Sequence, residues 1–435
     1  MKFFKELNQF MLMGAKAHAQ WELDVSNTIL HDRKRIALLC LLIVPILVCG
    51  VAFADNVAGQ LPKMLGGKTA YAPAFYTPTV FFASIGVGIV AGLITGCIGA
   101  GGGFIIAPAL MSAGVKGILA VGTDLFHIFA KAIMGSVLHR KLGNISVGLA
   151  VVFLIGSIGG ATLGGWINRT LYEKNPVLSD AFITTIYVLM LGFLCSYALM
   201  DFFRSRKPRP AQKSANADAA AAGLTNVACK LQSINLPPMI KFDEGITPGG
   251  RKISWVFLVL SGFIVGMAAS IMGVGGGFLT FPIFVYTLGV SSATTVGTDI
   301  FQIIFTAGYA GLGQYAVYGF IFYTLAIGML LGSLIGIQIG SFVTKVVSGS
   351  TICGLYAVAT SAGFVNRAFA LPSKLASMDI ISMSAETGKT LETVGTYIFF
   401  AVLTAFAIWV FYIFFANIRV LKGEGHLYTG KEVKA

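Results

Sequence analysis

The sequence predicts an all-α, polytopic integral membrane protein of two inverted repeats with glycine-broken helices and about 10 to 12 membrane segments. Composition indicates the class, because 56% of the residues are hydrophobic and only 11% are charged, too few for the surface of a soluble globule. A duplicated motif indicates the repeats: Gly-Ala-Gly-Gly-Gly-Phe-Ile-Ile-Ala-Pro at 99–108 returns as Gly-Val-Gly-Gly-Gly-Phe-Leu-Thr-Phe-Pro at 273–282. Gly-Thr-Asp follows each copy, at 122–124 and 297–299, so whole segments were duplicated. Hydrophobic segments broken by glycine at matching points are typical of secondary transporters.

Apolar stretches mark the expected spans, since about 18 or more largely apolar residues are enough to cross a bilayer as a helix. In chain order, the expected spans are 36–54, 80–98, 118–138, 145–168, 182–203, 254–272, 294–315, 318–343, 351–369 and 396–419. Two shorter apolar pieces, 103–113 and 277–289, directly follow the glycine clusters. Each piece is a half-helix, a re-entrant segment or a short steep span, and the sequence leaves these alternatives open.

Basic residues predict the orientation, because cytoplasmic loops of membrane proteins are enriched in Lys and Arg. They gather at 31–35, at 140–141, through 204–252 and at the C-terminus. The connections with few or balanced charges are 55–78, 169–181 and 371–394. We therefore expect both termini in the cytoplasm, a first repeat at 80–203 that starts outside and a second at 254–369 that starts inside. Each repeat contributes an odd number of membrane elements, so the two repeats lie upside down relative to each other.

The remaining segments complete the expected organisation. An amphipathic N-terminus at 1–35 and a tail at 420–435 are expected in the cytoplasm, and the first and last spans are additions outside the repeats. Ala-Phe-Ala at 52–54 also matches a signal-peptidase site, a less favoured alternative because the segment before the apolar run is long. The polar segment 204–252 is expected to be a cytoplasmic linker, with regulatory docking as the alternative to a simple tether.

The two triple-glycine clusters carry the candidate substrate site. A run of glycines interrupts the helical hydrogen-bond ladder, and in hydrocarbon the freed backbone must face a protein-lined or watery cavity. The half-helix that begins after the break has free N–H groups and a positive dipole end, where an anion can bind. The glycines expected to contact the substrate are Gly101, Gly102, Gly103, Gly275, Gly276 and Gly277.

Spaced glycines elsewhere in the apolar stretches have a simpler explanation, since small residues let membrane helices pack closely. Runs of glycine do not suit that role, which is why the two clusters are treated separately. The glycines assigned to helix packing are Gly86, Gly88, Gly92, Gly96, Gly156, Gly160 and Gly164.

One face of the segment after the first cluster carries ionisable residues, which a bilayer normally excludes. Asp124, His127 and Lys131 are spaced i, i+3 and i+7 and therefore share a helical face. The matching positions of the second repeat are Asp299, Gln302 and Thr306. We expect Lys131 to attract the anion, with a structural ion pair to Asp124 as the alternative. The candidate proton carriers are Asp124, His127 and Asp299, and histidine suits the task because it titrates near neutral pH.

Hydroxyl groups and one arginine complete the candidate residues. Thr123 and Thr298 each precede a candidate carboxylate, and their hydroxyls could bind a substrate oxyanion or broken backbone. We include both threonines among the substrate-binding residues. Arg367, near the outer end of its span, is expected to snorkel to the interface, with an entrance role as the alternative.

With these motifs in place, the chain resembles the sulfite exporter TauE/SafE family, also called the toluene sulfonate uptake permease family. The resemblance covers both repeats, about 80–369, and leaves out the linker and the two added helices. It implies an inner-membrane carrier that moves small sulfur-containing or organic anions, such as sulfite, sulfoacetate and related sulfonates, driven by the proton gradient. Carried over by motif, the functional positions are Gly101, Gly102, Gly103, Pro108, Gly122, Thr123, Gly275, Gly276, Gly277, Pro282, Gly297 and Thr298.

These observations predict a proton-coupled secondary transporter of small anions, with export as the expected direction. A passive anion channel or a membrane partner protein is the first alternative. An intramembrane enzyme is less favoured, because the 5 histidines do not gather in the sequence and no Glu-x-x-His pair occurs. We expect no catalytic residue, cofactor, metal or nucleic-acid partner. The expected partners are a small anionic substrate and the lipid bilayer, and a homo-oligomer is left open.

Overall fold

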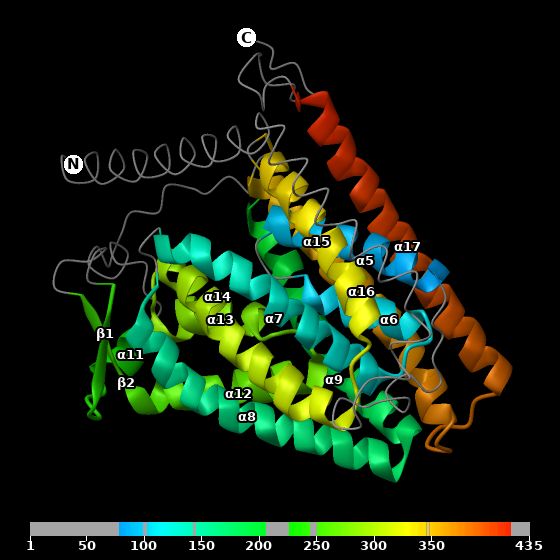
Figure 1. Ribbon diagram of the computed structural model, residues 1–435, viewed down its shortest axis with the longest axis horizontal. Coiled ribbons are helices and arrows are strands. Elements are labelled where there is room, and N and C mark those ends of the chain that lie inside the picture. The colour runs from blue at the N-terminus through cyan, green and yellow to red at the C-terminus, as the bar shows by residue number, and fades with distance from the viewer. Residues whose placement is uncertain are drawn as a thin grey trace.

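The computed structural model describes residues 78–98, 102–141, 145–205, 226–243, 250–344, 346–347 and 349–418. The expected N-terminal segment, the expected helix 36–54, the tail and Gly101 lie outside the described residues. The described chain is almost entirely helical (Figure 1), and each expected span within it overlaps a helix. In this part of the chain, 5 helices are long and apolar enough to cross a membrane, so the protein is an all-α, multi-pass membrane protein.

The first half of the fold begins with two helices that are separated at the glycine motif, and three long helices follow them. In order, it contains α5 (Pro78–Ile98), α6 (Gly103–Ser112), α7 (Gly117–Lys141), α8 (Val147–Lys174) and α9 (Pro176–Ser205). A single residue separates α8 from α9, and the side chain of Asn175 accepts the amide of Val177 at 2.9 Å to close this tight turn. Pro176 begins α9, where the missing N–H of proline is harmless because the first turn has no intrahelical acceptor.

The second half repeats this order with more irregular helices. It contains α12 (Trp255–Met272), α13 (Gly277–Pro282), the π-helix η2 (Ile283–Leu288), α14 (Ser292–Gly308), the π-helix η3 (Tyr309–Tyr315), the 3-10 turn η4 (Ala316–Tyr318), α15 (Tyr323–Val343) and α16 (Gly349–Ala376). Pro282 ends α13, since proline cannot donate to the helical ladder, and the chain continues as η2. The expected span 318–343 starts later than expected, because Gly319 at φ 80° ends the preceding turn in the left-handed region.

Part of the expected linker is folded. It forms α11 (Asn226–Ser233) and a two-stranded antiparallel hairpin of β1 (Met239–Phe242) and β2 (Arg251–Ser254), in which Met239 pairs with Ser254. The added C-terminal helix, α17 (Ala385–Ala416), packs mainly along α16. In Figure 1 the hairpin lies at one end of the molecule and α17 runs along the opposite edge.

Glycines hold the closest helix pairs together. At the packing glycines, an added Cβ atom would lie 1.9 to 2.6 Å from a backbone oxygen of the facing helix, far inside contact distance. This is true of Gly88, Gly92, Gly96, Gly156, Gly160 and Gly164. Their expected packing role is confirmed. The same expectation for Gly86 is wrong, because a Cβ atom there would meet nothing within 4 Å.

These close pairs join the two halves of the chain. α5 packs along α15, and α8 packs along α12. Gly88 faces Met329 and Gly92 faces Ser333, so α5 and α15 run in the same direction, and the contacts of α8 with α12 advance in the same way. The first helix of each half therefore lies parallel to the fourth helix of the other half.

Each half also contains a short segment that turns back after its glycine motif. The end of α6 lies beside the beginning of α5, where Leu110 and Ala113 line the same cavity as Ser84. The end of η2 lies beside the start of α12, since Arg251 of β2 donates to the carbonyl of Gly289 at 2.7 Å. Each short piece therefore runs back toward the start of the helix before it, and we call α6, and α13 with η2, the two returning segments.

Candidate functional site

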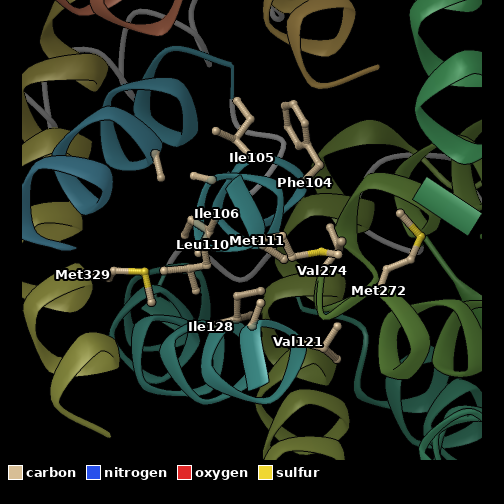
Figure 2. Packing of buried hydrophobic residues seen from close by; sticks show 14 of the residues in the cluster. Phe104, Ile105, Ile106, Leu110, Met111, Val121, Ile128, Met272, Val274 and Met329 are labelled. Atoms are coloured by element: carbon tan, nitrogen blue, oxygen red, sulfur yellow. The ribbon is translucent and has the colours of Figure 1, made fainter. Parts of the chain in front are cut away.

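The two glycine motifs lie against each other. A Cβ atom added to Gly103 would lie 3.2 Å from the Cα atom of Val274 in the second motif. The side chain of Ile128 is wedged between the motifs, with Cδ1 2.9 Å from that Cβ position and Cγ2 2.7 Å from the Cβ position of Gly275. Figure 2 shows Ile128 and Val274 among the buried apolar side chains around α6. Ile128, which the sequence did not single out, therefore fills the space between the two clusters.

The first glycine break is held by Thr95 of α5. The Thr95 hydroxyl donates to the carbonyl of Ala91 at 2.8 Å and accepts the amide of Gly102 at 2.7 Å. The ammonium of Lys131 donates to the same hydroxyl oxygen at 3.3 Å. A Cβ atom at Gly102 would lie 2.5 Å from the Ala91 carbonyl oxygen, so a side chain does not fit there. Two predicted substrate ligands, Gly102 and Lys131, thus meet at a threonine that the sequence analysis missed.

The second glycine break is faced by a carboxylate. Gly275 and Gly276 have φ angles of 71° and 89°, in the left-handed region that favours glycine. Asp299 Oδ2 lies 2.9 Å from the Cβ position of Gly277, at the start of α13. The first break therefore has an ammonium group beside it and the second a carboxyl group, although their glycine motifs are alike.

A directed chain of hydrogen bonds ends on Asp299. Gln302 Nε2 donates to Asp299 Oδ1 at 2.9 Å, and the hydroxyl of Thr306 donates to Gln302 Oε1 at 2.7 Å. The hydroxyl oxygens of Ser157 and Thr306 are 2.9 Å apart. Because Thr306 has only one proton, which it gives to Gln302, Ser157 is the donor in that contact. Asp299, Gln302 and Thr306 thereby all have hydrogen-bond partners.

Asp124 and His127, on the matching face of α7, are fully buried and only partly satisfied. Ser333 donates to the carbonyl of Gly88 at 3.1 Å, and its Oγ lies 2.9 Å from His127 Nε2. Ser333 has no second proton to give, so Nε2 is the donor in that contact. The other ring nitrogen, Nδ1, lies 3.5 Å from Asp124 Oδ1. Neither Nδ1 nor either carboxylate oxygen has a hydrogen-bond partner.

The alternative of a structural ion pair between Asp124 and Lys131 is not observed. Both oxygens of Asp124 lack a partner, and Lys131 donates to Thr95 instead. The donors do not resemble a metal centre either, since a metal site needs several His, Cys, Asp or Glu side chains together. Within the described residues, no group of 3 or more such side chains is arranged to hold a metal ion.

Thr123 and Thr298 make equivalent contacts in the two halves. The amide of Phe322 donates to Thr123 Oγ1 at 2.9 Å, and the amide of Ser146 donates to Thr298 Oγ1 at 3.0 Å. Phe322 immediately precedes α15, and Ser146 immediately precedes α8. Each threonine therefore holds the start of the fourth helix of the opposite half. In this conformation both hydroxyls bind backbone, one of the two alternatives expected for them.

Arg367 lies inside the protein. Its side chain is 1% exposed, so the expected snorkelling to the interface is wrong. Its Nε donates to Asn366 Oδ1 at 2.7 Å, and its Nη2 donates to Ser112 Oγ at 2.6 Å and to the carbonyl of Pro108 at 3.3 Å. The guanidinium thereby holds the end of α6, a contact that local sequence cannot reveal because Pro108 is 259 residues away.

The two returning segments are held in the same way, each by an acid and an arginine. At the end of α6, Asp180 accepts the first amide of α7 at 2.8 Å. At the end of η2, Asp243 of the linker accepts the amide of the residue just before α14, also at 2.8 Å. Arg367 donates to the carbonyl of Pro108 in the first returning segment, and Arg251 donates to the carbonyl of Gly289, just after the second. The linker is therefore docked on the second half, beyond the role of a simple tether.

An apolar cavity of about 340 Å³ lies at the C-terminal end of α6, whereas the glycine cluster is at the start of this helix. Its walls come from α5, α6, α15 and α17, and they include Ser84, Leu110, Phe322 and Phe400. None of the predicted substrate-binding residues lines it. A small hydrophilic anion has few polar partners in such a cavity, so the glycine motifs remain the better candidate site.

Comparisons with known proteins agree with this architecture. The family model described as "Sulfite exporter TauE/SafE" matches residues 84–366, more than half of the chain. "Probable membrane transporter protein YjnA" of Bacillus subtilis is 26% identical over 255 residues, which are 59% of this chain and 87% of that protein. A "Probable membrane transporter protein" of Xylella fastidiosa is 22% identical over 297 residues, 66% of this chain and 95% of that protein. "Sulfite exporter TauE/SafE family protein 6" of Arabidopsis thaliana is 36% identical over 116 residues, 25% of this chain and 27% of that protein. No solved structure matches the chain.

Proposed function

Because the chain belongs to the sulfite exporter TauE/SafE family and is a multi-pass membrane transporter, we propose that it moves small sulfur-containing or organic anions. The proposed substrates are of the sulfite, sulfoacetate and sulfonate class. Transport is coupled to protons and directed outward across the cell inner membrane, with both termini in the cytoplasm. The observation that carries the proposal is the meeting of two glycine motifs beside a buried ionisable face of α7.

Alternating access follows from the proposed inverted arrangement of two repeats, 80–203 and 254–369. The parallel pairs α5 with α15 and α12 with α8 support this arrangement, because α6 returns to the end where α5 begins, so that α7 runs with α5 and α8 runs opposite to it. The equivalent contacts of Thr123 and Thr298 on the opposite halves support it further. In this mechanism one repeat rocks against the other around a substrate held near the middle of the membrane.

The substrate lies between the two glycine motifs. Its proposed ligands are Gly101, Gly102, Gly103, Thr123, Lys131, Gly275, Gly276, Gly277 and Thr298. Charge orients the anion within this set, because the Lys131 ammonium attracts an oxyanion and the Asp299 carboxylate beside Gly277 repels it. The charged end of the substrate therefore binds at the first break, and its smaller or less polar end faces Ile128 and the second break.

Proton coupling is proposed for Asp124 and His127, with Asp299 as a further carrier. The contacts of His127 support it, because Nδ1 and Asp124 Oδ1 lie 3.5 Å apart and both are acceptors when His127 is neutral and Asp124 is ionised. Two buried acceptors without donors are costly, and one added proton satisfies the pair whether it rests on nitrogen or on oxygen. The pair is therefore suited to take up and release one proton in each transport cycle.

The test is transport of radiolabelled sulfite into proteoliposomes that contain the full chain, with and without an imposed pH gradient. We expect saturable flux that grows with the gradient and is inhibited by sulfoacetate but not by acetate. Flux that does not depend on the pH gradient contradicts proton coupling. Flux that does not saturate with sulfite concentration favours the channel alternative. If no sulfur anion moves, the substrate class is wrong. A Lys131→Met variant tests the site without crowding the glycine motifs, and wild-type transport by that variant would contradict it.

A further inference from the structure

Thr95 presents a single oxygen atom to two donors. Its own proton is committed, since the hydroxyl donates to the Ala91 carbonyl at 2.8 Å. Its lone pairs receive the amide of Gly102 at 2.7 Å and the ammonium of Lys131 at 3.3 Å. An amide at the start of a helix together with an ammonium group is a donor set that suits an oxyanion. The hydroxyl oxygen of Thr95 therefore occupies the place that an oxyanion's oxygen would take.

The second half has different groups at the matching positions. Ala269 takes the place of Thr95, and Thr306 takes the place of Lys131. At this break the carboxyl group of Asp299 lies beside Gly277, which disfavours a second anion. The contacts that would hold an oxyanion's oxygen are therefore found at the first break.

An independent observation on the same face of α7 also points to a charged occupant. The carboxylate of Asp124 and Nδ1 of His127, two turns and one turn before Lys131, are buried without hydrogen-bond partners. The polar groups that face them from neighbouring helices are Ser333 of α15 and Tyr187 of α9, whose hydroxyl donates to the carbonyl of Met272. The acceptor pair lacks a proton, and the partly buried ammonium of Lys131 favours an anion beside it. An oxyanion that binds together with a proton provides the proton that the acceptor pair lacks and the negative charge that the ammonium favours.

We propose that Thr95 is a stand-in for the substrate, so that an oxygen of a sulfite or sulfonate group displaces its hydroxyl and takes over the Gly102 amide and the Lys131 ammonium. This inference rests on the proposed function and adds to it the group that competes with the anion. Thr95 keeps both donors paired while the site holds no anion, and its release is part of each binding event. The affinity for the anion is therefore set in part by the hydroxyl that the anion must displace.

The test measures binding of sulfite, and separately of methanesulfonate, to the purified full chain by titration calorimetry. Thr95→Val keeps the shape of the side chain and removes the competing oxygen, so sulfite affinity is expected to rise about three- to tenfold, the effect of one net hydrogen bond. Thr95→Ser keeps the oxygen and the wild-type affinity. Thr185→Val is the matched control, because the partly buried Thr185 makes the same hydrogen bond, to Ala181 at 2.8 Å, away from the break. The two probes show whether an inorganic oxyanion or a sulfonate head group is preferred.

The gain in Thr95→Val is expected to disappear in the Lys131→Met background, which removes one of the two donors. Weaker sulfite binding, or binding unchanged as in Thr185→Val, by a Thr95→Val protein that melts like the wild type would overturn the stand-in role. Thr95→Ala provides the same comparison if valine lowers the melting temperature. If the wild type binds sulfite and only the Thr95 result fails, the proposed function stands. If the wild type binds neither probe, both proposals fail.

Discussion

The imidazole of His127 in the first half binds the hydroxyl of Ser333 in the second half, with Nε2 2.9 Å from Oγ. Ser333 is fixed in turn by the Gly88 carbonyl, to which it donates at 3.1 Å. This chain of contacts determines which nitrogen of His127 carries its hydrogen and leaves Nδ1 facing Asp124. A residue of one half therefore positions the candidate proton carrier of the other half.

We predict that Ser333→Ala moves the pH midpoint of sulfite transport to lower pH by about 0.5 to 1 unit. A charged imidazolium donates a stronger hydrogen bond to Oγ than a neutral ring does, so the serine stabilises the protonated state of the His127 and Asp124 pair. Without the serine, a lower pH is needed to protonate the same fraction of molecules. Transport rates in proteoliposomes across a pH series provide the measurement. Ser84→Ala is the control, because the buried Ser84 donates to the carbonyl of Phe81 at 2.6 Å and does not contact the histidine. Identical pH profiles for both variants would contradict a positioning role for Ser333.

Ile128 is predicted to limit the size of the substrate, since its side chain separates Gly103 from Gly275. Ile128→Val removes one methylene at a stability cost of about 0.5 to 1.5 kcal/mol, and it is expected to favour longer sulfonates over sulfite. Ile128→Phe is expected to reduce transport of all anions. The ratio of KM for a long-chain sulfonate to KM for sulfite is the measurement. Ile133→Val, at a position of α7 that is 44% exposed, should leave that ratio unchanged, and an unchanged ratio in Ile128→Val would exclude Ile128 from the site.

Sequence reasoning predicted the helices and the packing glycines because both depend on local signals, namely apolar length and the four-residue spacing of Gly156, Gly160 and Gly164. It failed at Gly86, whose spacing to Gly88 is irregular and whose Cβ position is open. The partners of Arg367 could not be predicted, because its contacts arise only when α16 packs on the end of α6. A threonine in an apolar helix, such as Thr95, gives no signal until the fold brings other groups to it.

The packing glycines provide a stability prediction with a control on the same kind of helix. Gly160→Ala would place a methyl group 2.0 Å from the Phe263 carbonyl oxygen, so α8 and α12 must separate. Overpacking of this kind costs about 1 to 3 kcal/mol, and a lower melting temperature in detergent is expected. Gly86→Ala should be neutral or slightly stabilising, because that position is open and alanine has the better helix propensity. Equal melting temperatures for the two variants would contradict the close packing of α8 on α12.

Asp243 of the linker holds the turn between η2 and α14, so we predict that Asp243→Asn makes this turn open more easily. Asp243 accepts the amide of Ser291 at 2.8 Å, the Ser291 hydroxyl at 2.7 Å and the Thr294 hydroxyl at 2.5 Å. Asparagine tolerates the φ of 56° at this position, so the change removes the charge and one acceptor oxygen without straining the backbone. Hydrogen bonds to a charged group contribute about 1.5 to 3 kcal/mol, so local opening should become easier by roughly that amount.

Faster amide hydrogen exchange in β1, β2 and the first turn of α14 is the expected observation for Asp243→Asn, together with an altered rate of sulfite transport. Asp379→Asn is the matched control, since Asp379 is exposed and has a similar φ of 58°. If exchange increases only in the hairpin, the linker does not hold α14. If exchange increases in α14 as well, the turn that follows the second returning segment depends on a residue outside both repeats, and the linker then controls the opening of the helix that carries Asp299.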